Sequence, residues 1–171
     1  MVATALTHSV VAAAPRHCPG GVMAQLNGLY QWQLARQNSG SRGDLALVRQ
    51  RFTPSLFALL QRAWDLDPQV DGAYLDFDVF SGTQMNTYGA AVQRCQVLGV
   101  NLVNARVAVA WGRGGRRDPS PSLLDYRMVR NGSGNGNGWR ISEITYLSNG
   151  QSHTLTSSLS NLLRAASRSP R

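Results

Sequence analysis

The sequence predicts an α+β fold in which N-terminal helices pack on a curved antiparallel sheet of four or five strands and a short helix closes the chain. Two observations lead to this prediction. Up to about residue 65 the apolar residues recur every three or four positions, which is typical of amphipathic helices. From residue 74 onward apolar and polar residues alternate, which is typical of strands. A curved sheet has a concave face that is either filled by side chains or open as a ligand pocket.

The first 65 residues contain two predicted helical stretches. Over residues 22–37 the apolar side chains fall on one helix face, and Asn38 begins an Asn-Ser-Gly segment that ends this helix. The second stretch begins at Asp44, a favourable N-cap residue. It is renewed at Thr53, where Pro54 occupies the first turn. Its apolar pattern ends near residue 65.

The second part of the chain contains the predicted strands, which cover residues 74–80, 90–98, 103–111, 123–130 and 139–147. Gly99 is expected to mark a bulge or a bend. The glycine- and asparagine-rich residues 131–138 are expected to connect the last two strands. Leucines at helical spacing predict the closing helix, namely Leu155, Leu159, Leu162 and Leu163. We therefore expect a leader over residues 1–20, one domain over residues 21–166 and a basic tail over residues 167–171.

The composition excludes several kinds of active site. All 17 basic residues are arginines and Glu143 is the only glutamate, so lysine nucleophiles, Schiff bases, P-loop lysines and paired-glutamate sites are ruled out. No apolar run approaches the roughly 18 residues of a membrane span, which predicts a soluble mature protein. The sequence also predicts no cofactor and no metal.

The net charge of +8 is concentrated in the second half of the chain, where residues 79–171 carry eleven arginines against three acidic residues. Arg113, Arg116 and Arg117 lie in a glycine-arginine run that resembles one RGG element of an RNA-binding segment. These three arginines are candidates for contact with an anionic partner. A single copy of such an element favours the alternative of a solvated hairpin tip, and the sequence does not favour nucleic acid as a partner.

The N-terminal residues predict an export signal, which would make the protein periplasmic or secreted. Residues 2–14 are small and mostly apolar and end in an Ala-x-Ala pattern. They lack a basic n-region, so a cytosolic leader and a cytoplasmic protein are the alternative. Cys18 and Cys95 are the only cysteines. An exported chain is expected to join them in a disulfide that ties the N-terminal segment to a strand, whereas in a cytosolic chain Cys95 would be a small buried residue.

Four sequence segments occur in an order that carries a resemblance to a known family. They read GLYQWQLARQNSG, FTPSLFALLQRA, YLDFDVFSGTQ and WRISEITYL. Over residues 22–165 the chain resembles an uncharacterised bacterial domain family whose members show a Tyr-x-Asp-Phe-Asp-Pro-Phe…Gln-Asp segment and a Trp-Arg-Ile-x-Asp-Ile strand. The resemblance implies a cystatin-like (nuclear-transport-factor-2-like) fold and export, and it implies no activity.

This chain departs from that family pattern at three positions. Val79 replaces the proline, Met85 replaces an aspartate and Glu143 replaces an aspartate. The change at Met85 removes an acid from the most polar part of the motif. This loss counts against a metal-binding or acid–base role for the motif.

Asp76 and Asp78 are the first candidate site residues, because two residues apart on a strand they would share one face. There they could bind a hard cation or share a proton, with Gln84 and Asn86 as further oxygen ligands. The alternative is that the two aspartates cap or hydrogen-bond the turn over residues 81–88. The sequence favours this structural alternative.

Aromatic residues on the predicted strands are the remaining pocket candidates. Trp111, Tyr126 and Trp139 are expected either to line a pocket for an apolar ligand or a sugar, or to form core between the sheet and the helices, and the sequence favours the core. His153 is the only histidine after the leader. It is expected in an exposed loop, without the partners that a catalytic triad needs.

Three functional hypotheses follow from the sequence. The first is a non-enzymatic, exported module that binds a small ligand or a protein through its sheet face; a homodimer through the sheet is a further option. The second is a small pocket enzyme of the isomerase or dehydratase type, with Asp76 or Asp78 as its base and Trp111 and Tyr126 lining the cavity. The third is an arginine-rich module that docks on an anionic partner.

Overall fold

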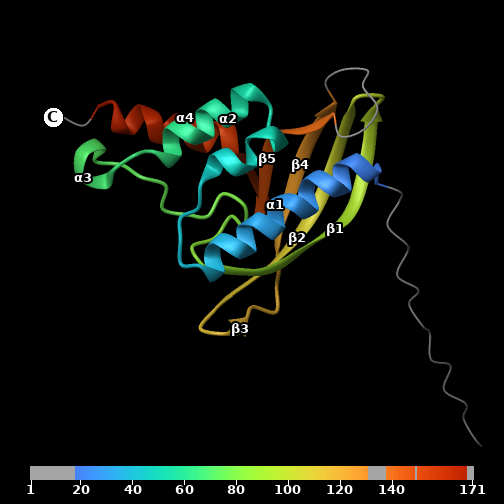
Figure 1. Ribbon diagram of the computed structural model, residues 1–171, viewed down its shortest axis with the longest axis horizontal. Coiled ribbons are helices and arrows are strands. Elements are labelled where there is room, and N and C mark those ends of the chain that lie inside the picture. Colours follow the sequence, from blue (N-terminus) through green and yellow to red (C-terminus); the bar gives the residue numbers. More distant parts are fainter. Residues whose placement is uncertain (1–17, 131–137, 149, 169–171) are drawn as a thin grey trace, which may run out of the picture.

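The computed structural model describes residues 18–130, 138–148 and 150–168, and these residues form an α+β fold with an open antiparallel sheet (Figure 1). The predicted helices are confirmed. Asp44 accepts a hydrogen bond from the Ala46 amide, although the helix that it caps is of the 3-10 type, and Thr53 caps the next helix, with Pro54 in its first turn. The helical elements are α1 (Gly20–Asn38), η1 (Leu45–Arg51), α2 (Pro54–Trp64), α3 (Pro68–Asp71) and α4 (Leu155–Ala166).

The sheet has six strands in the described residues, namely β1 (Asn86–Gly99), β2 (Leu102–Arg113), β3 (Arg116–Arg117), β4 (Ser122–Arg130), β5 (Trp139–Ser148) and β6 (Gln151–Thr154). Their order is β1-β2-β4-β5-β6, and β3 pairs with the end of β2. Each strand is antiparallel to its neighbours, so the chain runs as a meander with β1 and β6 at the edges. Residues 131–137 of the predicted connection lie outside the described residues, as do residues 1–17 and 169–171.

One predicted strand is wrong. Residues 74–80 form no strand, and the first strand begins only at Asn86, inside the segment expected as a turn. A single bridge between Asp78 and Thr83 is the only ladder contact in this region of the described chain. The expected strand is a folded loop because the Asp78 side chain hydrogen-bonds to the loop's own backbone, as described below.

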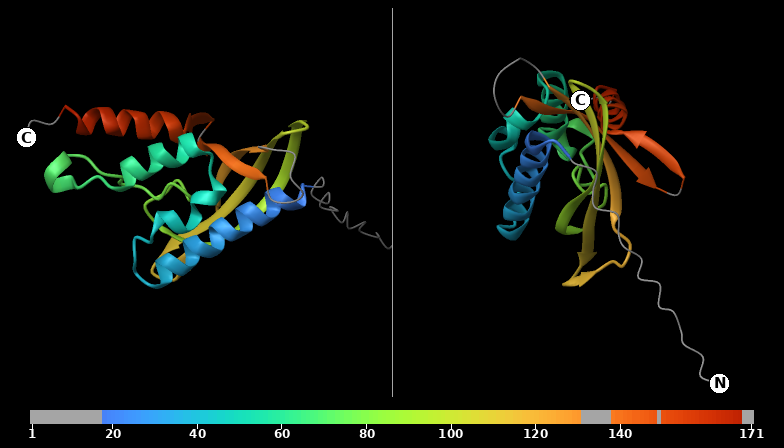
Figure 2. Two further views of the ribbon diagram at one scale, coloured as in Figure 1. Left: turned by 45° about the horizontal axis from the view of Figure 1, so that its top comes forward. Right: turned by 90° about the vertical axis from the view of Figure 1, so that its right-hand side faces the viewer.

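The core lies between α1 and one face of the sheet, and Figure 2 shows α1 running along that face. Val103, Ala105, Val107 and Val109 of β2 point into it and are fully buried, as the alternation predicted. Trp111, at the end of the same row, is only half-buried. Side chains therefore fill the space between α1 and the sheet. Each buried aliphatic side chain stabilises the fold by about 1.5–3 kcal/mol.

Register shifts in β1 and β5 influence which of their residues face the core. In β5 the register with β4 shifts after Ile141, so that Ile144 and Tyr146 are buried together with Trp139 and Ile141. A strictly alternating strand would instead turn residue 143 inward. In β1 the register shifts between Val92 and Arg94, and Gly99 ends the strand at another shift, which confirms the expected irregularity there.

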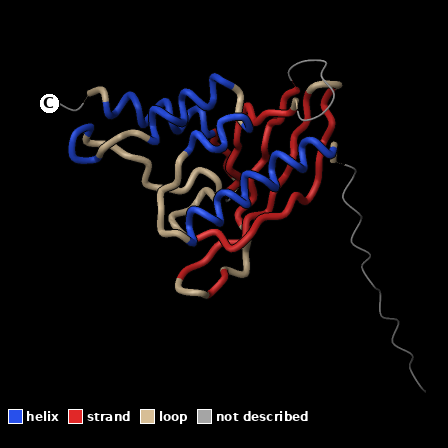
Figure 3. Tube along the Cα trace, in the orientation of Figure 1, coloured by secondary structure: helices blue, strands red, loops and turns tan. Residues whose placement is uncertain are grey.

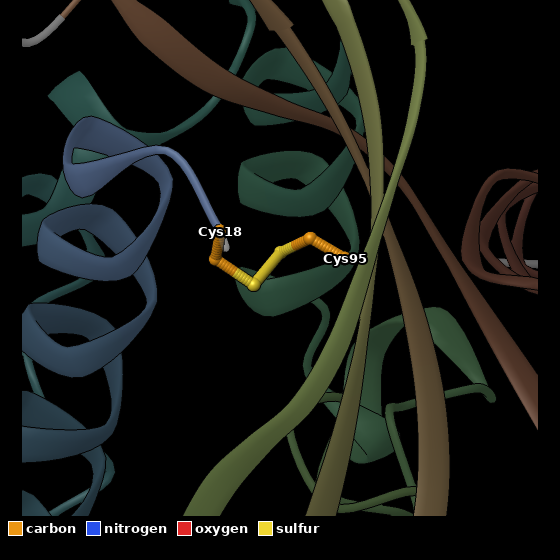
Figure 4. The surroundings of a disulfide bond; sticks show 2 residues. All are labelled: Cys18 and Cys95. Atoms are coloured by element: carbon orange, nitrogen blue, oxygen red, sulfur yellow. A yellow bond between two sulfur atoms is a disulfide. The ribbon is translucent and has the colours of Figure 1, made fainter. Parts of the chain in front are cut away.

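A disulfide joins Cys18 to Cys95 across 77 residues, as the sequence predicted for an exported chain. Cys18 lies just before α1, and Cys95 lies on the edge strand β1 (Figure 4). The bond therefore fastens the N-terminal end of α1 to the sheet. Among the described residues, no helix combines the length and the apolar character that crossing a bilayer requires.

Candidate functional site

A cavity of about 270 Å³ lies where the C-terminal ends of α1 and α2 meet residues 72–85, the segment between α3 and β1. We refer to this segment as the 72–85 loop and to the space as the loop cavity. Figure 3 shows loop segments in tan beside the end of α1. The side chains around the cavity that carry charge, an aromatic ring or an amide include Arg36, Arg42, Trp64, Asp76, Asp78 and Gln84.

The 72–85 loop is shaped by Asp78. Its backbone amide donates to the Thr83 carbonyl over 2.8 Å, and its own carbonyl accepts from the Gly82 amide over 2.8 Å. Its carboxylate Oδ1 accepts from the Phe80 amide over 2.8 Å. An aspartate that binds the backbone two residues further on is a common turn former. The structural alternative proposed for this motif is therefore confirmed for Asp78.

Two buried residues fix the loop against the core. Val79 and Phe80 are fully buried, and both of their backbone carbonyls accept a tyrosine hydroxyl. The Tyr146 hydroxyl donates to the Val79 carbonyl over 2.8 Å, and the Tyr30 hydroxyl donates to the Phe80 carbonyl over 2.9 Å. These bonds satisfy carbonyl groups that would otherwise be buried without a partner.

Gly82 is required at the turn of the loop. Its φ of +68° lies in the left-handed region. A Cβ atom at this position would lie 2.9 Å from Cδ1 of the Tyr146 ring. Only glycine meets both conditions without strain.

The Asp78 carboxylate also joins the loop to α1. Its Oδ2 accepts hydrogen bonds from Gln33 Nε2 and from Arg36 Nη2, the latter over 2.5 Å. The Arg36 and Asp78 side chains are only 11% and 14% exposed. Burial lowers the pKa of the Arg36 guanidinium from its usual value, and the neighbouring Asp78 carboxylate opposes that effect. The pair is a partly buried salt bridge that positions one wall of the loop cavity.

Two arginines lie close to the Trp64 ring. The guanidinium carbon of Arg36 lies 5.3 Å from the centre of that ring, and that of Arg42 lies 5.0 Å from it. Arg36 also lies over Trp32, at 5.2 Å. Such cation–π contacts are each worth about 0.5–1 kcal/mol at exposed sites. They hold Arg42 beside the cavity, although its guanidinium makes no hydrogen bond or ion pair with a described residue.

Asp76 and Gln84 are exposed on the same cavity. Neither side chain makes a hydrogen bond or an ion pair with any described residue. Asp76 and Asp78 were expected to share a strand face. That expectation is wrong because there is no strand, but both residues still line the loop cavity.

The other predicted pocket residues lie elsewhere. Trp111 lines a second cavity of about 450 Å³, together with Tyr146 and His153. His153 was expected in a loop; it lies on β6, is exposed and stacks on the Tyr146 ring with 4.9 Å between ring centres. Tyr126 and Trp139 lie in the core. The six pocket candidates are therefore divided between the loop cavity, a second cavity and the core.

A pair of tyrosine hydroxyls lies at the centre of the core. The hydroxyl oxygens of Tyr30 and Tyr126 are 2.7 Å apart. Since Tyr30 donates to the Phe80 carbonyl, Tyr126 is the donor in this pair. Burial raises the pKa of both phenols well above the usual value, and burial likewise raises the pKa of Tyr146.

The three candidate arginines for an anionic partner lie at the β2–β3 hairpin and are all exposed. Gly114 and Gly115, both with positive φ, form its turn. The Gly115 amide donates to the Tyr88 hydroxyl over 2.9 Å, and the Arg117 guanidinium lies 5.6 Å from the centre of the Tyr88 ring. Arg113 and Arg116 face each other across the hairpin.

The hydrogen bonds of the cavity's carboxylates determine which acid–base chemistry the loop cavity can support. A general base needs a carboxylate that is free to accept a proton from the substrate. The Asp78 carboxylate already accepts from Gln33, Arg36 and the Phe80 amide, whereas the exposed Asp76 carboxylate has no hydrogen-bond partner among the described residues. In the part of the chain that the structure describes, no three histidine, cysteine, aspartate or glutamate side chains gather as metal ligands. The cavity thus presents hydrogen-bonding and charged groups around an aromatic wall.

Sequence reasoning did not identify Arg36, Arg42 and Trp64 as site residues. One signal was available: Arg36 follows Trp32 by four residues, a spacing that places both side chains on the same face of a helix. The association of Arg42 and Trp64 with the 72–85 loop has no local signal, since tertiary packing alone brings these segments together.

The chain matches no protein-family model, no curated protein and no solved structure.

Proposed function

We propose that this protein is a non-enzymatic module that binds a small polar ligand in the loop cavity. The observation that carries the proposal is a set of polar side chains, Arg42, Asp76 and Gln84, that line one cavity and make no hydrogen bond or ion pair with a described residue. Such groups are available to a ligand without breaking a hydrogen bond or an ion pair of the fold. Trp64, a largely buried residue, holds Arg42 beside them by its cation–π contact.

The size and rigidity of the cavity support a small ligand. Its volume of about 270 Å³ is close to the lower limit of roughly 300 Å³ for ligand pockets. The hydrogen bonds of Asp78 and the burial of Phe80 hold one wall in place before any ligand arrives. A wall that is already ordered lowers the entropic cost of binding.

The fold name and the location belong to this proposal as well. We assign the chain to a cystatin-like (nuclear-transport-factor-2-like) architecture, on the basis of helices that pack on one face of an antiparallel meander. Export to the periplasm or the medium is supported by the Cys18–Cys95 bond, since disulfides persist in oxidising compartments.

A ligand screen tests the proposal. The full chain is mixed in turn with amino acids, sugars, polyols, carboxylic acids and amines, and its thermal unfolding temperature is measured. A compound present at 100 times its Kd is expected to stabilise the fold by about 2.7 kcal/mol. The shift is expected to shrink in Gln84→Ala and Trp64→Leu, and to persist in the control Arg62→Gln, which alters an exposed arginine that does not line the loop cavity. The proposal fails if no compound of any class binds, or if both cavity variants bind as tightly as the unaltered protein.

The hairpin arginines support a second candidate function, contact with an anionic macromolecule. Their exposure on a hairpin tip is the observation in its favour. Heparin binding at about 150 mM salt should then weaken steeply as the salt concentration rises. The variant with Arg113, Arg116 and Arg117 all changed to glutamine should lose most of this binding. Absence of binding to heparin and to DNA at that salt concentration eliminates the candidate.

A further inference from the structure

We infer that the ligand of the loop cavity is a small zwitterion, a molecule that carries one carboxylate or similar anionic group and one ammonium group, as a free amino acid does. This inference rests on the proposed function and specifies its ligand class. It is carried by the charges around the cavity.

The positive and negative side chains around the cavity are equal in number, and one of each sign has no ionic partner among the described residues. Its charged lining residues are two arginines and two aspartates. Arg36 and Asp78 neutralise each other in their salt bridge. Arg42 and Asp76 remain, and both are exposed without an ionic partner among the described residues. They line the same cavity, and no salt bridge joins them: the ion pairs of the described residues are Arg36–Asp78 and Arg106–Asp125.

A ligand with both charges satisfies both free groups at once. The Arg42 guanidinium can hold a carboxylate with two parallel hydrogen bonds, and the Asp76 carboxylate can accept hydrogen bonds from an ammonium group. The Trp64 ring restrains the Arg42 guanidinium before the ligand binds. The amide of Gln84 adds a donor and an acceptor beside them.

Ligands with a single charge meet one unfavourable neighbour in this cavity. A simple anion gains the contact with Arg42 but lies near the Asp76 carboxylate. A simple cation gains the contact with Asp76 but lies near Arg42 and Arg36. The opposed charges therefore select against singly charged compounds as well as for the zwitterion. The cavity volume of about 270 Å³ is sufficient for a ligand of roughly the size of one amino acid.

The experiment compares four forms of each of the twenty amino acids: the free zwitterion, the anionic N-acetyl form, the cationic amide and the neutral N-acetyl amide. Binding to the full chain is measured by thermal shift and then by calorimetry. At least one free amino acid is expected to bind, and each blocked form of it is expected to bind at least about tenfold more weakly, since each lacks a charge-assisted hydrogen bond.

Variants of Arg42 and Asp76 should change the affinities for the four forms in a specific pattern. Asp76→Asn should weaken the binding of the free amino acid and raise the affinity of the N-acetyl form relative to that of the free amino acid. Arg42→Gln should weaken the binding of the free amino acid and raise the affinity of the amide relative to that of the free amino acid. The controls Asp65→Asn and Arg62→Gln, which alter exposed charges near the end of α2 that do not line the cavity, should leave all four affinities unchanged. Thermal unfolding of each variant without ligand verifies that it is folded.

The outcomes separate this inference from the proposed function. If a blocked form binds as tightly as the free amino acid, or if only sugars, polyols or other non-zwitterions bind in the loop cavity, the inference is wrong and the proposed function stands. If no compound of any class binds, both are wrong. Equal affinities in Arg42→Gln, Asp76→Asn and the unaltered protein also overturn the inference.

Discussion

The Arg36 guanidinium donates a hydrogen bond to the Asp78 carboxylate over 2.5 Å and so joins the last turn of α1 to the 72–85 loop. Both side chains are largely shielded from water, and Gln33 donates to the same carboxylate oxygen. This contact positions the wall of the loop cavity. It also explains why Asp78 serves the structure, whereas Asp76, two residues earlier, is free to contact a ligand.

Removal of one partner of this salt bridge should be costly. Asp78→Asn leaves the Arg36 guanidinium without its ionic partner, and Arg36→Gln leaves the Asp78 carboxylate without its own. Either change should lower the free energy of unfolding by about 3 kcal/mol, as is typical when a buried ion pair loses one member. Urea unfolding measures the loss. Asp76→Asn on the same loop should change stability by less than about 0.5 kcal/mol, and equal losses at both positions would contradict this account.

The buried tyrosines predict a loss of stability at alkaline pH. Burial raises the pKa of Tyr30, Tyr126 and Tyr146 in the folded state above the value near 10 of the unfolded chain. Their contribution to stability is therefore complete below pH 10 and is lost as the pH rises above it. Urea unfolding at pH 8, 10 and 11, values chosen to bracket that usual pKa of about 10, should show this fall.

A single variant tests the tyrosine account. Tyr126→Phe should make the alkaline loss shallower, because one titrating group is removed. It should also lower stability at neutral pH by about 1 kcal/mol, because the hydrogen bond to Tyr30 is lost. The exposed Tyr74→Phe serves as control. A flat pH profile in the unaltered protein, or an identical slope in Tyr126→Phe, would count against the account.

The disulfide should contribute to stability through the unfolded state. The Cys18–Cys95 bond closes a segment with a sequence separation of 77 residues. Chain-entropy arguments give such a cross-link about 4.5 kcal/mol. Replacement of both cysteines by serine should lower the free energy of unfolding by about that amount, and reduction of the unaltered protein should have a similar effect. The account is contradicted if guanidinium unfolding under oxidising and reducing conditions has the same midpoint.

Gly82 should tolerate alanine less well than Gly40. Both have positive φ, so alanine costs about 1–2 kcal/mol of backbone strain at either position. At Gly82 the added Cβ also meets the Tyr146 ring, whereas at Gly40 no atom lies within 4 Å. Thermal unfolding should therefore show the larger loss for Gly82→Ala. Equal losses for the two variants would mean that the ring contact is unimportant.

The sequence was sufficient for the elements that local rules specify. Asp44 and Thr53 mark helix starts by their capping side chains, and the alternation around Val107 marks a strand with one buried face. The same rules failed over residues 74–80, where alternating residues imitate a strand. There the Asp78 carboxylate binds the Phe80 amide and replaces the ladder by a turn.

The candidate site was predictable only in part, for a related reason. Asp76, Asp78 and Gln84 could be named because they are close together in the sequence. Arg42, between α1 and η1, and Trp64, at the end of α2, join them only through tertiary packing, which no local pattern encodes. Likewise, the bulge that turns Ile144 inward in place of Glu143 depends on the pairing of β5 with β4.

The most direct test of the central claim is a ligand titration of the isotope-labelled full chain, followed by amide NMR chemical shifts. The ligand is the compound that gives the largest thermal shift in the screen. The account predicts that the amides that move are those of residues 36–42 and 75–86, and that the same titration of Gln84→Ala moves them less. Shifts centred instead on Trp111 and His153, or on the hairpin at residues 113–117, would contradict it.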